Sequence, residues 1–180
     1  MSRFLFPVLF ILSWGLAFEA GDVLAQEQKS RYVTLVYAEM KVLQEFNSNL
    51  QLNRTLESAI HQKNVITAAD EVLAKVDIIV EKVQAVLDMF PDNYHIQLVL
   101  LSDASEVAAN YKQKYGKSVN HIAYYSLSEK TIYISVTDTR LRVLAHEIGH
   151  SVVDYYFQQV RPPYNIHELM AQFAEQHVTD

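Results

Sequence analysis

Residues 143–157, "VLAHEIGHSVVDYYF", are the most informative part of the chain. Two histidines, His146 and His150, stand four residues apart, and Glu147 directly follows the first. On an α-helix, residues four apart lie about 40° from each other around the axis and one turn apart along it. Both imidazoles can therefore reach one point in space, and the Glu147 carboxylate lies beside that point.

These side chains suit zinc-dependent hydrolysis. Two neutral imidazoles bind the metal, and a carboxylate that is not a ligand takes a proton from the reacting water and passes it on. An HExxH motif on a helix supplies this set. The alternative is a pair of partly exposed histidines that make ordinary hydrogen bonds. We interpret the motif as a Zn²⁺ site in which His146 and His150 are ligands and Glu147 is the general base.

Gly149 lies inside the same predicted helix. Glycine in a helix interior costs about 1 kcal/mol relative to alanine, so its presence needs an explanation. One explanation is the close approach of another element near the metal, and the other is tight packing without functional content. The sequence leaves both open.

A catalytic zinc usually has three protein ligands, so a third has to be found. The pattern HExxHxxGxxH is absent, because Val153 and Tyr156 stand where its glycine and last histidine would be. The remaining common solution is a glutamate from a later helix. Glu168 suits this role, because the break at residues 162–163 lets the chain turn and present a second helix across the site.

Glu168 also has an alternative explanation. Asn165 and Glu168 have the spacing of an N-cap and N3 pair, so Glu168 could simply close a capping box. Three other side chains could supply the third ligand instead, namely His167, Glu175 and His177.

An HExxH motif followed by a helix that bears a glutamate resembles the gluzincins, the thermolysin-like zinc peptidases, and the size suggests their minimal members. The resemblance implies an α+β, zincin-like fold. In that fold a small mixed twisted sheet lies over the HExxH helix, an edge strand lines the substrate cleft, and a C-terminal helix presents the glutamate ligand. It also implies that His146, His150 and Glu168 bind zinc and that Glu147 is the general base. The motifs lie in the last third of the chain, and the remainder matches only in the order of elements.

The chain departs from the thermolysin-like pattern at two places. An aspartate that would bond a zinc histidine is replaced by Gln172, whose amide oxygen can accept the same bond without charge. The second place is the tyrosine or histidine that would stabilise the oxyanion. His177 is the one histidine after Glu168, and Tyr164 is a candidate in front of that helix. Tyr155 and Tyr156 are further substitutes.

Apolar and β-branched runs predict strands over residues 32–38 and 96–101. Two further runs, "HIAYYSL" and "TIYISV", flank residues 128–130 and predict a hairpin. One strand of this hairpin should be the edge that pairs with an extended peptide, but the pattern does not say which.

Helix signals fill the spaces between these strands. A capping-box start at Thr67 predicts a long amphipathic helix that Pro91 ends, and a second helix runs from Asp103 to Gly116. Residues 39–62 are ambiguous, because a helical pattern is interrupted by polar residues.

The last two helices include the candidate site. Thr137 or Asp138 should cap the helix with the HExxH motif, and Asn165 should cap the last helix. The apolar stripe of the last helix is expected to consist of Ile166, Met170, Phe173 and His177.

Composition limits the other function classes. The chain has 180 residues and no cysteine, so residues 26–180 can form one domain without disulfides or a thiolate zinc site. A formal net charge of −6 argues against a nucleic-acid partner.

The N-terminus resembles a signal peptide. Arg3 precedes an apolar run over residues 4–18, and small residues at 23 and 25 suggest cleavage after Ala25. The apolar run is shorter than the about 20 residues that span a bilayer, although an uncleaved anchor is the alternative. We therefore expect export to the periplasm or the medium, without a membrane partner after cleavage.

Together these features predict an exported, monomeric zinc metallopeptidase that cleaves an extended peptide or protein. The main alternative is a zincin-like domain that binds zinc or peptides but has lost useful catalysis. A metal-free exported structural protein would require the HExxH motif to be accidental.

Overall fold

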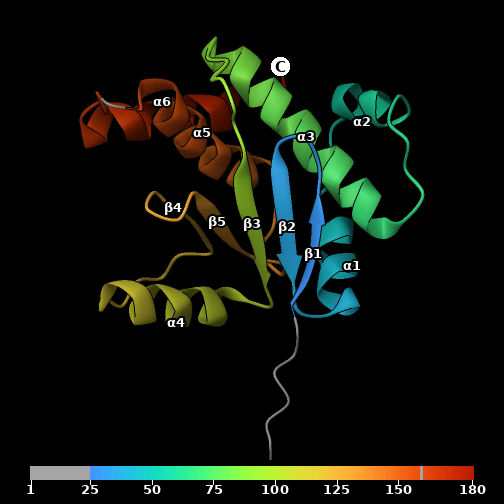
Figure 1. The fold of residues 1–180 in the computed structure, drawn as a ribbon, viewed down its shortest axis with the longest axis horizontal. Helices are drawn as coiled ribbons and strands as arrows, with labels where there is room; N and C mark the ends of the chain where they lie inside the picture. The colour runs from blue at the N-terminus through green and yellow to red at the C-terminus, as the bar shows by residue number, and fades with distance from the viewer. Residues whose placement is uncertain (1–24, 159) are drawn as a thin grey trace, which may run out of the picture.

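The computed structural model describes residues 25–158 and 160–180. Within these ranges the chain forms a mixed α+β fold with one five-stranded sheet and six helices (Figure 1). The strands are β1 (Gln26–Lys29), β2 (Val33–Tyr37), β3 (Ile96–Leu101), β4 (Ala123–Ser126) and β5 (Thr131–Ser135). The helices are α1 (Met40–Asn49), α2 (Arg54–Ile60), α3 (Ala68–Leu87), α4 (Ala104–Tyr115), α5 (Leu141–Phe157) and α6 (Tyr164–His177).

The sheet order is β1-β2-β3-β5-β4. Strands β2, β3 and β5 are parallel, whereas β1 and β4 pair antiparallel at the two edges. The predicted strands and the hairpin are confirmed, and the structure identifies β4 as the edge strand of that hairpin. β1 was not predicted, because its polar sequence QEQK lacks the apolar alternation of a half-buried strand.

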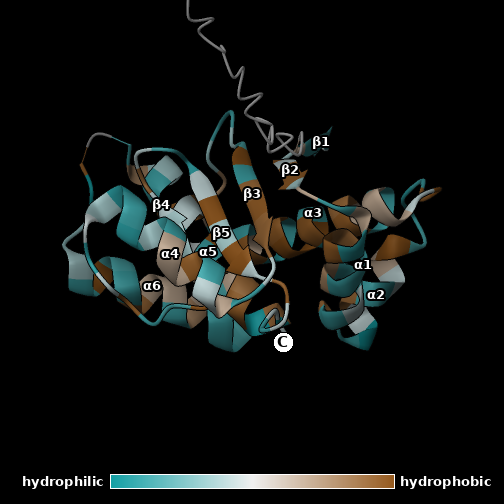
Figure 2. Cartoon of the chain, turned by 90° about the horizontal axis from the view of Figure 1, so that it is seen from below, coloured by the Kyte–Doolittle hydropathy of each residue, from teal (hydrophilic) through white to brown (hydrophobic). Residues whose placement is uncertain are grey.

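Helices cover both faces of the sheet. Alternate residues of β3 show this: Ile96, Leu98 and Leu100 join the larger core with α1, α3 and α5, whereas Val99 and Leu101 face a smaller core under α4. Figure 2 shows the hydrophobic residues concentrated on the inner strands and on α3. The outer helix α6 packs on α5 and α3.

The capping box at the start of α3 is confirmed, since the Thr67 hydroxyl accepts a hydrogen bond from the Asp70 amide and the Asp70 carboxylate accepts one from the Thr67 amide. The predicted end at Pro91 is wrong. The helix stops at Leu87, because Asp88 adopts the left-handed conformation, with φ 53°, and closes the last turn.

The region between β2 and α3 resolves into two short helices, α1 and α2, and the Asn53 side chain caps the second. The predicted helix from Asp103 to Gly116 is confirmed. The Asp103 carboxylate accepts hydrogen bonds from the amides of Ser105 and Glu106, and Gly116 ends the helix with a φ of 69°.

The predicted cap of α5 is wrong. The helix begins at Leu141 with Arg140 at the N-cap position and without a side-chain cap. The Asp138 carboxylate instead accepts hydrogen bonds from the Ser135 and Thr137 hydroxyls, 2.6 and 2.9 Å away. Asp138 therefore stabilises the turn between β5 and α5 rather than the helix itself.

The predicted signal peptide falls on residues 1–24 and the adjoining Ala25, so its apolar run lies outside the described residues and it stays a prediction. In the described part of the chain, no helix combines the length and the apolar character that a membrane span requires.

Candidate metal centre

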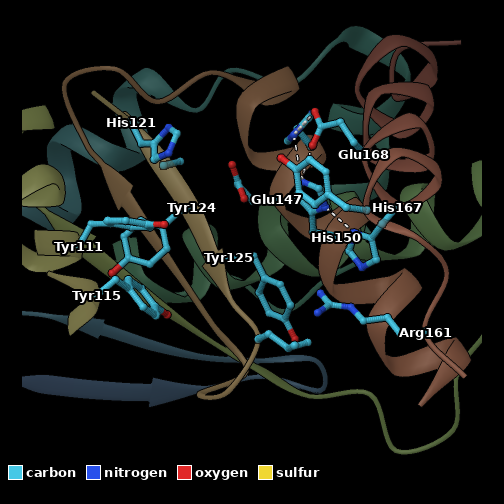
Figure 3. Close-up of a pocket in the computed structure, with 14 residues that line it drawn as sticks. Tyr111, Tyr115, His121, Tyr124, Tyr125, Glu147, His150, Arg161, His167 and Glu168 are labelled. Carbon is cyan, nitrogen blue, oxygen red and sulfur yellow. Dashed lines mark hydrogen bonds and ion pairs between the residues drawn. The ribbon is translucent and has the colours of Figure 1, made fainter. Parts of the chain in front are cut away.

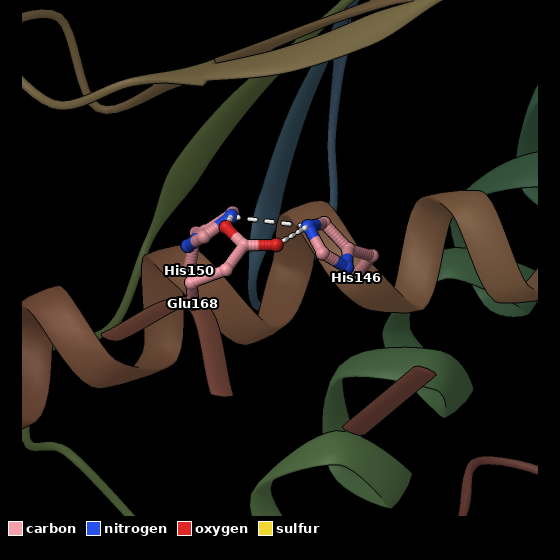
Figure 4. Close-up of side chains that lie close together, drawn as sticks. All are labelled: His146, His150 and Glu168. Atoms are coloured by element: carbon pink, nitrogen blue, oxygen red, sulfur yellow. Dashed lines mark hydrogen bonds and ion pairs between the residues drawn. The ribbon is translucent and has the colours of Figure 1, made fainter. Parts of the chain in front are cut away.

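Helix α5 lies under the sheet and presents the two histidines of the motif toward α6. The Nε2 atoms of His146 and His150 are 3.1 Å apart. From α6, the two carboxylate oxygens of Glu168 lie 3.6 Å from the His146 Nε2 and 3.4 Å from the His150 Nε2. Figure 4 shows the Glu168 carboxylate between the two imidazoles. The predicted third ligand therefore meets the HExxH histidines at one point.

The spacing of these atoms suits a tetrahedral zinc ion. Ligands placed tetrahedrally at zinc–nitrogen and zinc–oxygen distances of about 2.0–2.1 Å lie about 3.3–3.4 Å from one another. The three distances, 3.1, 3.4 and 3.6 Å, bracket that value. Two imidazole nitrogens and one carboxylate oxygen are also ligands that a catalytic zinc accepts. The donor set thus fits the ion on both geometry and chemistry.

Helix α6 begins at Tyr164, with Pro163 at the N-cap position and no side-chain cap. The prediction that Asn165 caps this helix is therefore wrong, because Asn165 already lies within its first turn. With it the capping-box explanation of Glu168 fails, since Glu168 is not at the N3 position.

The predicted apolar stripe of α6 is also wrong. Its buried residues are His167, Ala171 and Ala174, whereas Ile166 and Phe173 are exposed. The reason is that α6 packs through small residues against α5.

Gly149 explains why small residues are needed. A Cβ atom at Gly149 would lie 3.0 Å from the Ala171 Cα and 3.2 Å from the Ala174 Cβ, which is too close for ordinary packing. The glycine thus allows α6, the helix that presents Glu168, to approach α5. This supports the first of its two explanations, the close approach of an element near the proposed metal.

The Nδ1 atom of each histidine has its own partner. The Glu175 carboxylate lies 3.0 Å from the His146 Nδ1, so Glu175 orients a candidate ligand instead of joining the cluster. Gln172 was expected to bond a zinc histidine. Its amide instead donates a hydrogen bond to Glu168, at 3.1 Å, because the two residues lie one turn apart on α6.

His167 lies behind His150. Its Nδ1 atom is 2.8 Å from the Nδ1 of His150, and its side chain is almost completely buried. A metal on the His150 Nε2 requires the proton on its Nδ1, so His167 accepts that proton's hydrogen bond and has its own proton on Nε2. His167 is therefore a partner of a candidate ligand rather than the third ligand.

His177 does not reach the site. It lies at the end of α6, where its Nδ1 is paired with the Asp180 carboxylate. It lies nine positions after Glu168, about 13 Å farther along the helix axis. The prediction that His177 could stabilise an oxyanion or bind the metal is therefore not supported by its position.

Burial sets the protonation of the two central groups. Burial raises the pKa of Glu147 to about 8. A hydrogen bond from the Tyr125 backbone N–H lowers this pKa by a smaller amount, and the negative charges of Glu168 and Glu175 raise it further. Burial lowers the pKa of His150 to about 3, helped by His146, His167 and Arg161. His150 is therefore neutral at physiological pH, as a metal ligand must be.

A cleft of about 510 Å³ opens beside the cluster. One wall consists of tyrosines from α4 and β4, and Glu147 and the candidate ligands lie between this wall and Arg161, which comes from the segment between α5 and α6 (Figure 3). Tyr164, the first residue of α6, also lines the cleft. Tyr164 thus lies at the cleft, but its side chain is 80% exposed. Of the other tyrosine candidates, Tyr155 donates its hydroxyl to the His95 carbonyl and Tyr156 is exposed.

Two contacts that no sequence pattern indicated join the β4–β5 hairpin to α5. The Tyr125 hydroxyl donates to the Asp154 carboxylate at 3.0 Å, and Lys130 forms an ion pair with the same carboxylate. Asp154 is buried one turn after His150. A buried acidic residue at that spacing is the signal that could have indicated this role.

No family model, curated protein or solved structure matches the chain. The interpretation of the site consequently depends on the chemistry of its own residues.

Proposed function

We propose that this protein is a zinc-dependent peptide hydrolase with a zincin-like fold and a gluzincin-type ligand set. The main support is the convergence of His146 and His150 from α5 with Glu168 from α6, next to the buried Glu147. The position of the edge strand β4 beside the same cleft is further support.

His146, His150 and Glu168 would hold the ion. Bound there, zinc would supply Lewis acidity toward a water molecule and the substrate carbonyl oxygen. Glu147 would take the proton from the attacking water and return it to the leaving amine. A base is most effective when its pKa lies near the working pH, and burial shifts the pKa of Glu147 in that direction. Glu175 and His167 would hold the two imidazoles in the required tautomer.

The substrate would be a peptide in extended conformation. Within the described residues, β4 pairs with β5 alone, so its other edge can form main-chain hydrogen bonds with an added strand. Tyr164 remains our candidate for a hydrogen bond to the oxyanion, because it is the proposed residue that lies at the cleft. Export through the predicted signal peptide and action as a monomer remain part of the proposal.

Glu147→Gln tests this function. The amide cannot take a proton, so the variant should keep about one zinc per chain and lose nearly all peptide hydrolysis. Elemental analysis of the purified protein and digestion of a peptide library measure the two properties, and His150→Ala is the control that should lose both. Hydrolysis at the wild-type rate in Glu147→Gln would contradict the mechanism. Bound zinc without hydrolysis in the wild-type protein would favour a zinc- and peptide-binding domain instead.

A further inference from the structure

Arg161 lines the cleft together with the candidate ligands, and it is the one lysine or arginine among the described lining residues. The salt bridges of the described residues do not include it. The two lysines next to the β4–β5 hairpin differ in this respect, since Lys114 is paired with Glu129 and Lys130 with Asp154. Arg161 is exposed and its side chain lies at the cleft (Figure 3), and no carboxylate of the described chain pairs with its guanidinium.

His167 adds a second donor on the same side. Its side chain is 4% exposed, and its Nε2 is a buried nitrogen without a hydrogen-bond partner in the described structure. With a metal on the His150 Nε2, the His150 Nδ1 would donate to the His167 Nδ1, and the proton of His167 would then lie on this Nε2. Figure 3 shows the Arg161 side chain beside the His167 ring. An unpartnered buried N–H is costly, so an acceptor that reaches it is favoured.

The start of α6 favours the same kind of ligand. Tyr164 and His167 from its first turns line the cleft, and the helix has no side-chain cap. The positive end of the helix dipole therefore lies at the cleft next to Arg161. A guanidinium, a histidine N–H and an uncapped helix start all favour an anionic group, and the carboxylate is the anion that an unmodified peptide has and that a guanidinium can bind through two parallel hydrogen bonds.

We propose that Arg161 and His167 form a carboxylate-binding subsite, so that the preferred substrates have a carboxylate close to the scissile bond. This deepens the proposed hydrolase function and rests on it. The carboxylate could be the C-terminus of a peptide or the side chain of an aspartate or glutamate. The tyrosine wall, with Tyr111, Tyr115 and Tyr124, lies at the far end of the cleft from Arg161 (Figure 3). An aromatic or apolar side chain on the other side of the scissile bond would suit that wall.

The test compares peptides that differ in one group. One pair has a free or an amidated C-terminus, and a second pair with blocked ends has an internal glutamate or glutamine. We expect kcat/KM of the zinc-loaded wild-type protein to be about tenfold higher for the carboxylate member of one pair, and the pair that responds identifies the source. Arg161→Gln should remove this preference, and Arg161→Lys should restore part of it, because lysine keeps the charge but not the forked geometry. Arg142→Gln, an equal charge change at an exposed position of α5, should leave the preference intact.

Binding provides a readout that does not need turnover. In the zinc-loaded Glu147→Gln protein, calorimetry should give a Kd for the carboxylate peptide about tenfold below that of its neutral partner, and adding Arg161→Gln should equalise the two. Two results would overturn the subsite. One is an equal Kd for the carboxylate and the neutral peptide both with and without Arg161→Gln, and the other is a loss of affinity on Arg161→Gln that is the same for both peptides. Absence of all hydrolysis in the wild-type protein, with the binding preference intact, would contradict the hydrolase function and leave the subsite standing.

Discussion

At the scale of single residues, Glu147 combines burial with an ionisable group. In the metal-free protein its pKa is about 8, above the ordinary value of 4.5 that it has in the unfolded chain. The folded state therefore binds the proton more tightly, and its stability decreases as the pH rises from about 4.5 to about 8. At pH 7 the free energy of unfolding is therefore roughly 2–4 kcal/mol lower than at a pH below 4.5, where Glu147 is protonated in both states.

Glu147→Gln should therefore stabilise the metal-free protein, because the neutral amide has no charge to bury. The gain in the free energy of unfolding should be small near pH 4.5, grow up to about pH 8 and then level off. Urea unfolding of both proteins in chelator at several pH values measures it. Parallel stability curves would mean that Glu147 is solvated in the folded protein.

Glu168 and Glu175 lie on the same face of α6 but contact different imidazole atoms, Nε2 for Glu168 and Nδ1 for Glu175. Substitution by glutamine distinguishes their roles. Glu168→Gln replaces an anionic ligand with a neutral amide, so zinc affinity should fall by at least about a hundredfold. Glu175→Gln keeps an acceptor for the His146 Nδ1 and loses only its charge, so the fall should be about tenfold.

Competition with a chelator of known affinity measures both values. His177→Ala is the control, and it should leave zinc affinity unchanged because His177 lies at the far end of α6. A larger loss of zinc affinity in Glu175→Gln than in Glu168→Gln would mean that Glu175 is the ligand and Glu168 is not.

At the scale of elements, the packing of α6 on α5 sets the distance between the candidate ligands. Alanine normally stabilises a helix by about 1 kcal/mol relative to glycine. At Gly149 the new methyl group would meet the backbone of Ala171, so Gly149→Ala should instead destabilise the protein by roughly 1–3 kcal/mol. It should also weaken zinc binding, because Glu168 moves away from the histidines together with α6.

Gly116→Ala is the matched control. Its cost comes from the positive φ at the end of α4, on the other face of the sheet, and no atom crowds the new methyl group. It should lower the unfolding free energy without changing zinc affinity. Unchanged zinc binding and stability in Gly149→Ala would mean that α6 adapts without moving Glu168.

At the scale of the whole molecule, the proposed zinc would join the two last helices of a chain without disulfides. A ligand that binds only the folded state stabilises it, by about 2.7 kcal/mol at a hundredfold excess over its Kd. For a domain of this size, removal of zinc should lower Tm by about 5–10 °C. Thermal unfolding with and without chelator measures the shift, and the His146→Ala variant should not respond. An equal Tm for the zinc-loaded wild-type protein in chelator would show that the metal does not stabilise the fold.

Much of this arrangement could be predicted because it is local. The spacing of His146 and His150 fixes their side chains on one face of a helix, and the capping box at Thr67 specifies the start of α3 within four residues. The runs that form β2, β3 and the β4–β5 hairpin have the apolar and β-branched composition of strands. Each of these features depends on residues that are close in the sequence, so pattern and geometry are sufficient to find it.

Other features depend on which surfaces meet, and the tertiary structure alone decided them. β4 became the edge because β5 lies between it and β3, and Glu168, a candidate already in the sequence, came within 3.6 Å of both histidines because Gly149 lets α6 approach α5. The partners of the imidazoles, Glu175 and His167, and the position of Arg161 at the cleft follow from that approach. Composition and periodicity specify the residues of each element, whereas contacts between distant elements depend on packing that no short segment encodes.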